Sequence, residues 1–196
     1  MAKRKAEIKR LTGETNIALS LNIDGQGKGK IKTGVPFFSH MLELFAKHGV
    51  FDLKLSAKGD IEVDYHHTVE DVGICLGLAF KKALGKKAGI NRYGEARVPM
   101  DESLSEVIID VSGRPHLTYN VAISKKKFVD FDVEVVKEFF EAFTLNAGIT
   151  MHVNLIRGQN MHHIIESIFK AFAVALSKAC EISPRKKGIP STKGIL

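Results

Sequence analysis

Hydrophobic and polar residues alternate along several short segments of the chain, and along four longer segments the hydrophobic residues recur every three or four positions. Alternation places successive side chains on opposite faces of a strand, so the short segments are predicted to be β-strands. They cover residues 4–10, 16–24, 30–33, 51–57, 93–100, 104–111, 115–123 and 149–156. The helical spacing predicts helices at residues 35–49, about 66–84, about 132–147 and 161–180.

Local start and stop signals support these helix boundaries. Pro36 lies in the first turn of the first predicted helix, where its missing N–H leaves no bond unmade. Three of the helices end at or just before a glycine, Gly49, Gly85 or Gly148, and glycine readily adopts the conformation that ends a helix. Short turns separate the three strands between residues 93 and 123, so the sequence predicts a meander there.

The two halves of the chain repeat one order of elements. Each half has strands, a helix that ends at a glycine, another strand and a second helix, which predicts an α+β fold of tandem duplicated β-β-α-β-α halves. In each half we expect a mostly antiparallel sheet with two helices on one face. The expected boundaries are residues 1–90 and 91–182, followed by a tail at 183–196. No linker rich in Pro, Gly or Ser separates the halves, so they are expected to pack as one unit.

One short motif occurs once in each half, at the start of the second helix. Residues 64–71 read D-Y-H-H-T-V-E-D and residues 160–167 read N-M-H-H-I-I-E-S, so both contain His-His-x-x-Glu. On a helix the glutamate lies three and four residues from the two histidines, which puts it on the same face as both rings. Imidazoles and carboxylates are ligands for divalent Mn, Fe, Co, Ni or Zn. Adjacent histidines point about 100° apart, so each doublet can serve two different metals.

This metal-binding interpretation competes with structural roles for the same residues. A single His-x-x-x-Glu pair is usually a surface interaction, and an isolated histidine such as His40 or His152 is usually a partly exposed residue. Two copies of the doublet at equivalent helix starts favour metal binding. Asp64 is expected to orient a histidine ring without binding the metal itself. The predicted metal ligands are His40, His66, His67, Glu70, His152, His162, His163 and Glu166.

Composition narrows the class of protein. The 196 residues suffice for one domain of two similar halves or for two small domains. The formal net charge is +7, but the basic residues stand beside acidic neighbours, few aromatics lie among them, and there is no tryptophan. A solvated basic surface is favoured, a site for a small anion accounts for part of the charge, and nucleic acid is the least favoured partner. Neither a signal peptide nor a bilayer-spanning run is recognised, so we expect a soluble cytoplasmic protein with no membrane partner, in which Cys75 and Cys180 are buried thiols.

Longer segments resemble the imidazoleglycerol-phosphate dehydratase family over nearly the whole chain. They include G-V-P-F-F-S-H-M-L, D-Y-H-H-T-V-E-D, P-M-D-E-S-L, D-V-S-G-R-P, H-H-I-I-E-S-I-F-K-A-F-A and P-S-T-K-G. The resemblance implies a ribosomal protein S5 domain 2-like fold and the removal of water from imidazole glycerol phosphate to give imidazole acetol phosphate in histidine biosynthesis. It also implies two Mn²⁺ ions per active site, which bind the substrate's imidazole between them. The implied assembly is a homo-oligomer of twenty-four subunits with shared active sites.

The resemblance implies roles for individual residues as well. Glu14, in E-T-N-I, lines the substrate site and is the residue we expect to act as acid or base, and Glu70 and Glu166 are also expected to be catalytic. One departure from the family pattern is Leu44, where many members carry a glutamine that helps to hold the phosphate. The implied substrate-binding residues are Glu14, His40, His66, Arg92, Arg114, His162, Ser191, Thr192 and Lys193.

Two other functions are considered beside the dehydratase. A metal-dependent hydrolase would use the same ligands to activate water. A basic binding module would keep the histidines as structural residues, and Arg92 and Arg114 would then be ordinary turn or surface residues. Metal content and activity of the purified protein distinguish the three.

Overall fold

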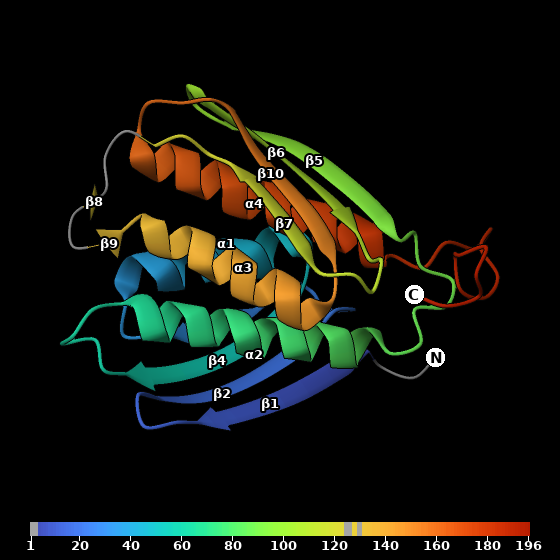
Figure 1. Cartoon of the computed structure of the whole chain (residues 1–196), viewed down its shortest axis with the longest axis horizontal. Helices are drawn as coiled ribbons and strands as arrows, with labels where there is room; N and C mark the ends of the chain where they lie inside the picture. The colour runs from blue at the N-terminus through green and yellow to red at the C-terminus, as the bar shows by residue number, and fades with distance from the viewer. Residues whose placement is uncertain (1–3, 124–126, 129–130) are drawn as a thin grey trace.

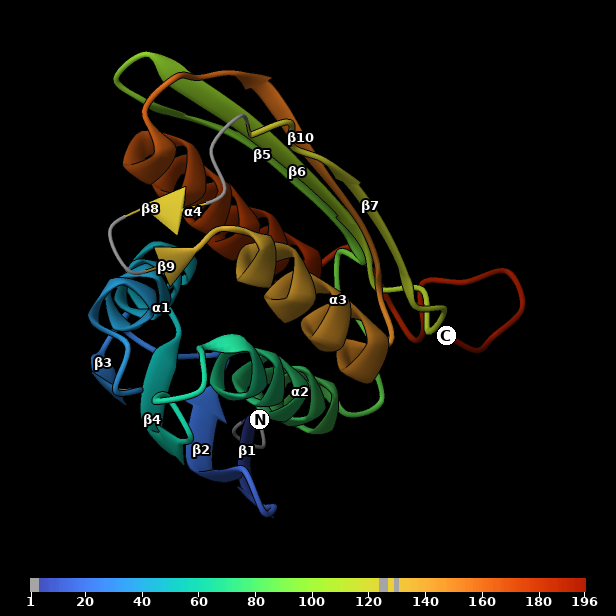
Figure 2. The same ribbon diagram turned by 60° about the vertical axis from the view of Figure 1, so that its left-hand side comes forward.

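The computed structural model describes residues 4–123, 127–128 and 131–196, which form two four-stranded sheets with four helices between them (Figure 1). The helices are α1 (Pro36–Gly49), α2 (His66–Leu84), α3 (Glu134–Ala147) and α4 (Met161–Cys180). The strands are β1 (Lys5–Leu11), β2 (Thr15–Asn22), β3 (Gly29–Lys32), β4 (Asp52–Gly59), β5 (Tyr93–Met100), β6 (Ser103–Asp110), β7 (His116–Asn120), β8 (Lys127–Phe128), β9 (Phe131–Asp132) and β10 (Thr150–Arg157). The predicted α+β class is confirmed, and the layers run sheet, helices, sheet (Figure 2).

Each half of the chain contributes one sheet, and the two sheets have equivalent strand orders. The first is ordered β1-β2-β4-β3 and the second β5-β6-β10-β7. Neighbouring strands are antiparallel except at one edge of each sheet, where β3 pairs with β4 and β7 with β10 in parallel. A parallel pair needs a crossover connection, and α1 and α3 provide it. Each half therefore contains the order β-β-β-α-β-α, one strand more than the predicted unit, and the second half adds the two-stranded sheet β8-β9 before α3.

The predicted meander between residues 93 and 123 is wrong in its last step. Strands β5 and β6 form a hairpin, but β7 pairs with β10, which lies between β6 and β7. The alternation of side chains fixes which face of the sheet a residue occupies, and it carries no information on which strand lies alongside. Strand β7 also ends at Asn120, before the predicted end at residue 123.

The core lies in the helix layer, between the inner faces of the two sheets. Many of the largest buried side chains are phenylalanines, and they come from both halves. The rings of Phe45 and Phe172 stack with their centroids 5.1 Å apart, and those of Phe38 and Phe139 meet edge to face at 5.4 Å. These contacts join α1 to α4 and α1 to α3, so the aromatic core bridges the two halves.

Helices α2 and α3 approach closely because α2 carries glycine where they meet. A Cβ atom at Gly73 would lie 2.7 Å from the carbonyl oxygen of Phe139, and one at Gly77 would lie 2.6 Å from that of Phe143. Both distances are too short for a carbon atom, so this approach requires glycine. The four helices thus form one continuous layer that both halves share.

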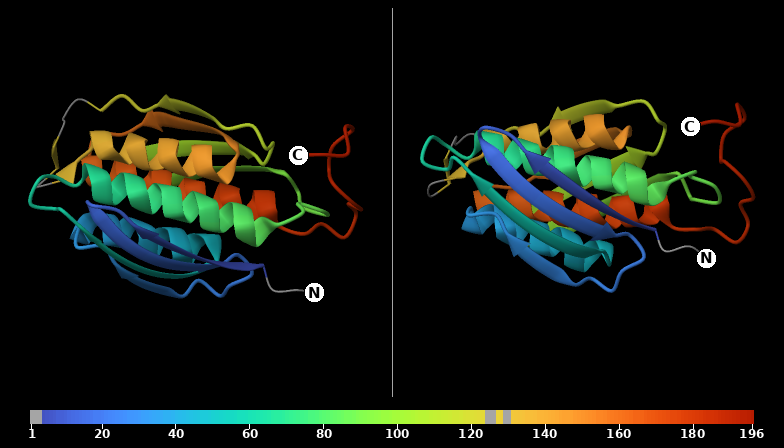
Figure 3. Two further views of the ribbon diagram at one scale, coloured as in Figure 1. Left: turned by 60° about the horizontal axis from the view of Figure 1, so that its bottom comes forward. Right: turned by 90° about the horizontal axis from the view of Figure 1, so that it is seen from below.

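The C-terminal tail lies against loops at one end of the second sheet. Ile182 forms an isolated bridge with Ile90, and the Gly89 N–H donates a 2.7 Å hydrogen bond to the Gly188 carbonyl. Strand β1 begins at the same end of the molecule (Figure 3). The tail is therefore fastened to the loop before β5 along its first residues.

The structure also bears on the expectations for the two cysteines and for membrane-spanning segments. Cys75 and Cys180 are buried free thiols, as predicted. Burial raises the pKa of the Cys75 thiol to about 11, which keeps it protonated near neutral pH. None of the helices in the described part of the chain combines the length and the hydrophobicity that a bilayer-spanning segment needs.

Candidate active site

Both histidine doublets lie in the first turn of a long helix, at the same end of the helix layer (Figure 1). The Asp64 carboxylate accepts a 2.8 Å hydrogen bond from the His66 backbone N–H. The Asn160 side chain accepts one of 2.9 Å from the His162 backbone N–H. A helix start leaves such donors without a partner inside the helix, so these bonds fix the first turns of α2 and α4.

Three of the predicted ligands come together where α1 meets α4. His162 Nε2 lies 2.9 Å from Glu166 Oε2, and His40 Nε2, from α1, lies 3.5 Å from the same oxygen. One candidate ligand atom from each residue lies within 4.8 Å of the other two. The Glu166 side chain is only 8% exposed, whereas that of His40 is 44% exposed, so the cluster opens to solvent at His40.

A lysine that the sequence analysis did not single out completes this cluster. Lys170 follows Glu166 by one helix turn, and its Nζ lies 2.6 Å from Glu166 Oε1. Burial acts to raise the pKa of Glu166, but the hydrogen bonds from Lys170 and His162 and their charges outweigh burial and hold that pKa below its usual value. Glu166 is therefore an anion beside the two imidazoles.

The equivalent groups of the first half are more open. His66 Nε2 lies 3.8 Å from Glu70 Oε2, and both side chains are 43% exposed. In both halves the glutamate lies beside the first histidine of the doublet, four residues earlier, and not beside both histidines as predicted. The second histidine of each doublet turns toward a different element.

A carboxylate from another segment holds each of these second histidines. His67 Nδ1 lies 3.0 Å from Asp60 Oδ2, and His163 Nδ1 lies 2.7 Å from Glu102 Oε2. The hydrogen bonds raise the pKa of both imidazoles above its usual value. The bond from His163 also holds the pKa of Glu102 well below the usual carboxyl range. Asp64, which was predicted to orient a ring, bonds to the backbone, and Asp60 orients the ring instead.

Glu14 lies in the hairpin turn between β1 and β2, next to the first doublet. Its Oε1 is 3.8 Å from His67 Nε2, on the side of the ring opposite Asp60. The side chain is 56% exposed, and no donor among the described residues forms a hydrogen bond to its carboxylate. Glu14 therefore stands beside a predicted metal ligand with its carboxylate accessible.

Arg92 lies at the opposite end of α4 from the doublet. Its backbone N–H donates a 2.8 Å hydrogen bond to the carbonyl of Ala179, in the last turn of the helix. Its guanidinium donates to both carboxylate oxygens of Asp110, at 2.7 and 3.1 Å, and to the Pro190 carbonyl at 3.0 Å. Arg92 is thus tied to the tail segment that carries three other predicted substrate-binding residues, Ser191, Thr192 and Lys193.

Arg114 lies at this same end of the molecule. It follows Gly113, where a Cβ atom would lie 2.6 Å from the carbonyl carbon of the last residue, Leu196. From His162 to Ala179 the helix rises by about 25 Å. The predicted substrate-binding residues of this end, Arg92, Arg114 and those of the tail, therefore lie at the opposite end of the chain from the histidine doublets.

His152 is set apart from the other predicted metal ligands. It is exposed on the outer face of the second sheet, in β10, opposite Ile108 of β6 and Thr118 of β7. The ring of His116 is its neighbour, with centroids 6.2 Å apart. The helices cover the other face of this sheet (Figure 2), so His152 and the doublets lie on different sides of it.

Comparison with known proteins identifies the family of this chain. The family model for imidazoleglycerol-phosphate dehydratase matches residues 33–176, and the imidazoleglycerol-phosphate dehydratase of Geobacter metallireducens is 58% identical over 193 residues, which cover 98% of this chain and 99% of the relative. The chain belongs to the imidazoleglycerol-phosphate dehydratase family. The dehydratase of Caldanaerobacter subterraneus subsp. tengcongensis is also 58% identical, with 98% of this chain and 100% of the relative covered.

Solved structures of imidazoleglycerol-phosphate dehydratases have the same fold. The Staphylococcus aureus structure superposes with a TM-score of 0.83 at 42% identity and covers 91% of this chain and 99% of its own. The Pyrococcus furiosus structure, a complex with (S)-C348, gives 0.84 at 36% identity and covers 96% and 100%. The chain is therefore an enzyme, an imidazoleglycerol-phosphate dehydratase of histidine biosynthesis, and the predicted fold is confirmed.

Three residues of this candidate site escaped the sequence analysis, namely Asp60, Glu102 and Lys170. Only Lys170 carried a local signal, because it lies four residues after Glu166 on a predicted helix. Leu44, at the position where the family resemblance implies a glutamine, is partly buried and packs against the hydrophobic core. It offers no polar atom to a phosphate.

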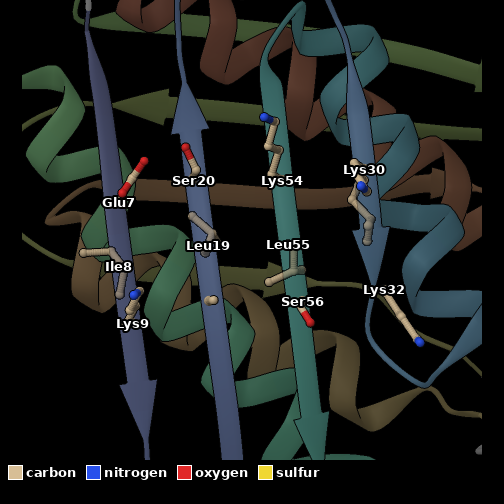
Figure 4. A pocket seen from close by; sticks show the side chains of 12 residues that line it. Glu7, Ile8, Lys9, Leu19, Ser20, Lys30, Lys32, Lys54, Leu55 and Ser56 are labelled. Atoms are coloured by element: carbon tan, nitrogen blue, oxygen red, sulfur yellow. The ribbon is translucent and has the colours of Figure 1, made fainter.

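A groove on the outer face of the first sheet is separate from these residues (Figure 4). It encloses about 490 Å³ and is lined by lysines of β1, β3 and β4 and by small side chains of β2 and β4. No predicted catalytic, substrate-binding or metal-binding residue lines it. The groove therefore belongs to the surface of the first sheet and not to the candidate active site.

Proposed function

We propose that the protein removes water from D-erythro-imidazole glycerol phosphate and forms imidazole acetol phosphate. Membership of the family supports the reaction class. The observation that carries the choice of substrate is the meeting of His40, His162 and Glu166 at the same end of the helix layer as a second doublet of the same type. Since an imidazole is itself a metal ligand, a substrate with an imidazole ring suits a site made of two sets of divalent-metal ligands.

The donor set fits Mn²⁺, and we propose two such ions per active site. Imidazole nitrogens and carboxylate oxygens bind borderline divalent ions. Glu166 is buried and anionic, a state that a nearby cation favours, and Lys170 supplies that cation within the chain. When bound, the metal ions would stabilise the negative charge of the substrate's imidazole as the hydroxyl leaves. The proposed ligands are His40, His66, His67, Glu70, His152, His162, His163 and Glu166.

Glu14 is proposed to move the carbon-bound proton of the substrate. That carbon is not next to a carbonyl group, so its proton is weakly acidic and needs a positioned base. The accessible carboxylate of Glu14, 3.8 Å from His67 Nε2, supports this role. Glu70 and Glu166 would contribute to catalysis by keeping the histidine side chains and the metal charge in place.

The phosphate is proposed to bind at the tail end of the chain. Arginine offers a planar fork for phosphate oxygens, and lysine offers a point charge. The hydrogen bond from Arg92 to the Pro190 carbonyl brings one such fork next to the tail. The hydroxyls of the tail add further donors. The residues proposed for phosphate binding are Arg92, Arg114, Ser191, Thr192 and Lys193.

A single chain does not bring the two ends of this site together. The doublets and the phosphate ligands are separated by about 25 Å of α4, which a glycerol phosphate chain does not span. His152 also faces away from the doublets. We therefore propose that sites form between neighbouring subunits of the twenty-four-subunit assembly, where the helix starts of one subunit meet the tail end of another. The buried free thiols fit the reducing cytoplasm in which we expect the enzyme to work.

The reaction is tested with the purified protein, imidazole glycerol phosphate and Mn²⁺. The metal-loaded enzyme is expected to form imidazole acetol phosphate, and a chelator is expected to abolish product formation. Inorganic phosphate is measured in parallel, because a hydrolase would release phosphate without forming this product. Absence of dehydration by metal-loaded protein rejects the proposal.

Shared sites are tested by mixing two inactive variants in one assembly. His162→Ala removes a helix-start ligand, and Arg114→Ala removes a phosphate ligand at the tail end. Co-expressed assemblies are expected to regain part of the wild-type activity, because some sites then receive both intact ends. Native mass measurement gives the size of the assembly. A stable monomer with full activity contradicts the shared site.

A further inference from the structure

The hairpin turns of the two halves place a glutamate at the same position. The first hairpin turns at residues 12–15 and the second at residues 100–103, and both have a two-residue loop. Glu14 is the second loop residue of the first turn, and Glu102 is the second loop residue of the other. Both turns lie next to the doublet of their own half.

In the second half this glutamate is fully engaged. Glu102 Oε2 lies 2.7 Å from His163 Nδ1. Its Oε1 accepts hydrogen bonds from the backbone N–H groups of Gln159, at 3.2 Å, and Asn160, at 2.8 Å, and from the Ser103 hydroxyl at 3.0 Å. One carboxylate oxygen therefore bonds to the imidazole ring, and the other accepts hydrogen bonds from the loop before α4.

These contacts decide which nitrogen of the ring carries the proton. A carboxylate only accepts hydrogen bonds, so the ring nitrogen beside it must be the donor. In the neutral ring of His163 the proton is thus on Nδ1, and the lone pair on Nε2 is available. His67 has the same arrangement, with Asp60 Oδ2 3.0 Å from its Nδ1. Histidines that bind metals commonly donate their second N–H to a carboxylate in this way.

We infer that Glu102 is a positioning residue, which holds the His163 ring in the orientation and tautomer that bind Mn²⁺ through Nε2, and that Asp60 does the same for His67. This inference rests on the proposed manganese site. It also separates the two hairpin glutamates. Glu102 acts through His163, whereas Glu14 lies on the Nε2 side of His67 and is left to act on the substrate.

The two positioning carboxylates differ in a way that makes the inference testable. In wild type three groups donate hydrogen bonds to Glu102 Oε1. In Glu102→Gln these donors still need an acceptor, so the amide oxygen occupies the position of Oε1 and the NH₂ group faces His163. Nδ1 must then accept, the proton moves to Nε2, and metal binding is blocked. Asp60 Oδ1 is buried and has no hydrogen-bond partner among the described residues. In Asp60→Asn the amide can therefore turn its oxygen toward His67 and keep the metal-binding tautomer.

The experiment measures the Mn²⁺ dissociation constant of assembled wild type, Glu102→Gln and Asp60→Asn by electron paramagnetic resonance. Of the two proposed Mn²⁺ ions, the one that binds more weakly is expected to have a dissociation constant about 10–100-fold higher in Glu102→Gln than in wild type. Asp60→Asn is expected to lose less affinity. Glu95→Gln, an exposed carboxylate on the same hairpin, is the matched control and should bind as wild type does. Native mass and circular dichroism establish that each variant assembles and folds.

Turnover as a function of manganese separates positioning from chemistry. Glu102→Gln is expected to regain most of the wild-type kcat at saturating Mn²⁺, because excess metal overcomes the cost of the wrong tautomer. Wild-type affinity in Glu102→Gln, or a kcat that stays low at saturating metal, overturns the inference while leaving the proposed function intact. If wild type itself takes up no manganese, the proposed function fails and the inference fails with it. Should Glu102→Gln not assemble, Glu102→Asp, which withdraws the carboxylate from the ring, makes the same test.

Discussion

The two halves share one backbone plan and differ at the starts of their second helices. In the second half Glu166 is buried beside an imidazole and Lys170, and His40 reaches it from the first half. In the first half Glu70 is 43% exposed, and Ile74 occupies the position that corresponds to Lys170. The duplicated motif thus provides two similar ligand sets. Among the described residues, a ligand from another helix, His40, joins the second set alone.

The outer faces of the two sheets differ as well. Lys54 is the third residue of β4, and His152 is the third residue of β10, so they occupy equivalent positions. Lys54 lies directly opposite Lys30 on a basic groove (Figure 4), whereas His152 lies opposite an isoleucine and a threonine. One position of the repeat has become a proposed metal ligand, and its counterpart has become a surface lysine.

The largest expected effect is on catalysis, when Glu14, the glutamate of the first hairpin turn, is changed. Glu14→Gln keeps the size of the side chain and removes its ability to take up a proton. We expect kcat to fall by about 10²–10⁴-fold with unchanged Mn²⁺ content. Steady-state kinetics at saturating metal, next to elemental analysis, measures both quantities. Wild-type kcat in Glu14→Gln would show that the exposed glutamate has no role in proton transfer.

The cation beside Glu166 in the second half is tested by Lys170→Met. This change leaves the Glu166 carboxylate buried with one partner fewer, so metal-free protein is expected to lose about 3 kcal/mol of unfolding free energy. Chemical denaturation of chelator-treated protein measures the loss. The control is Ile74→Met at the corresponding position, which conserves volume and should cost less than about 1.5 kcal/mol. Equal effects of the two changes would contradict a special role for Lys170.

The pair formed by Glu102 and His163 should make the stability of metal-free protein depend on pH. The pKa of Glu102 is lowered by the hydrogen bond from His163, so its contribution is present above the usual carboxyl pKa and is lost as pH falls toward the lowered value. The pKa of His163 is raised by the same bond, so its contribution is present below the usual imidazole pKa and is lost as pH rises through the raised value.

The difference in denaturation midpoint between wild type and Glu102→Gln is therefore expected to be largest between about pH 4.5 and 6.5. It should shrink on both sides of that window. Urea denaturation of chelator-treated protein across this range measures it. A difference that does not vary with pH would mean that the pair contributes no linked protonation.

The smallest effect is expected on the outer face of the first sheet. Lys54→Ala removes one of two lysines that lie directly opposite each other, and like charges in that arrangement repel. We expect a gain of about 0.3 kcal/mol in unfolding free energy at low salt and no gain at high salt, where the repulsion is screened. The unfolding free energy of His152→Ala should change little. Its Mn²⁺ content, measured by elemental analysis, should fall. If Lys54→Ala and His152→Ala had the same effects on stability and on Mn²⁺ content, the two positions would not differ in function as proposed.

The sequence predicted the elements better than it predicted their neighbours. Alternation and helical spacing located the principal strands and the four helices, because each signal depends on residues close together in the chain. The place of β7 beside β10 was missed, since strand pairing depends on the packing of α3 over the second sheet. The strands at 30–33 and 115–123 were predicted as elements, but the predicted β-β-α-β-α unit did not count them, and the structure places them as the parallel edge strands β3 and β7.

The candidate site could be predicted as far as residue types and repetition carry information. The doublets and His40 were recognised, and the structure brings His40, His162 and Glu166 together. The carboxylate of Glu102 lies 61 residues from its histidine in sequence, so no local pattern connects them. Asp60 is only seven residues from His67, but a loop separates them. The number of residues in a loop does not tell where the loop places its side chains, so this contact could not be predicted.

The shared helix layer has a consequence for how the protein is made. Helix α1 is covered by α4 and α2 by α3, so the glycines of α2 and several aromatic rings of α1 pack against the second half. At about 5–20 residues per second, a ribosome needs roughly 5–20 s to add the missing helices after the first half has emerged. During that interval the nascent chain exposes the surface on which its own second half will later fold. Each half produced alone should therefore aggregate, and the two produced together as separate chains should recover the native assembly.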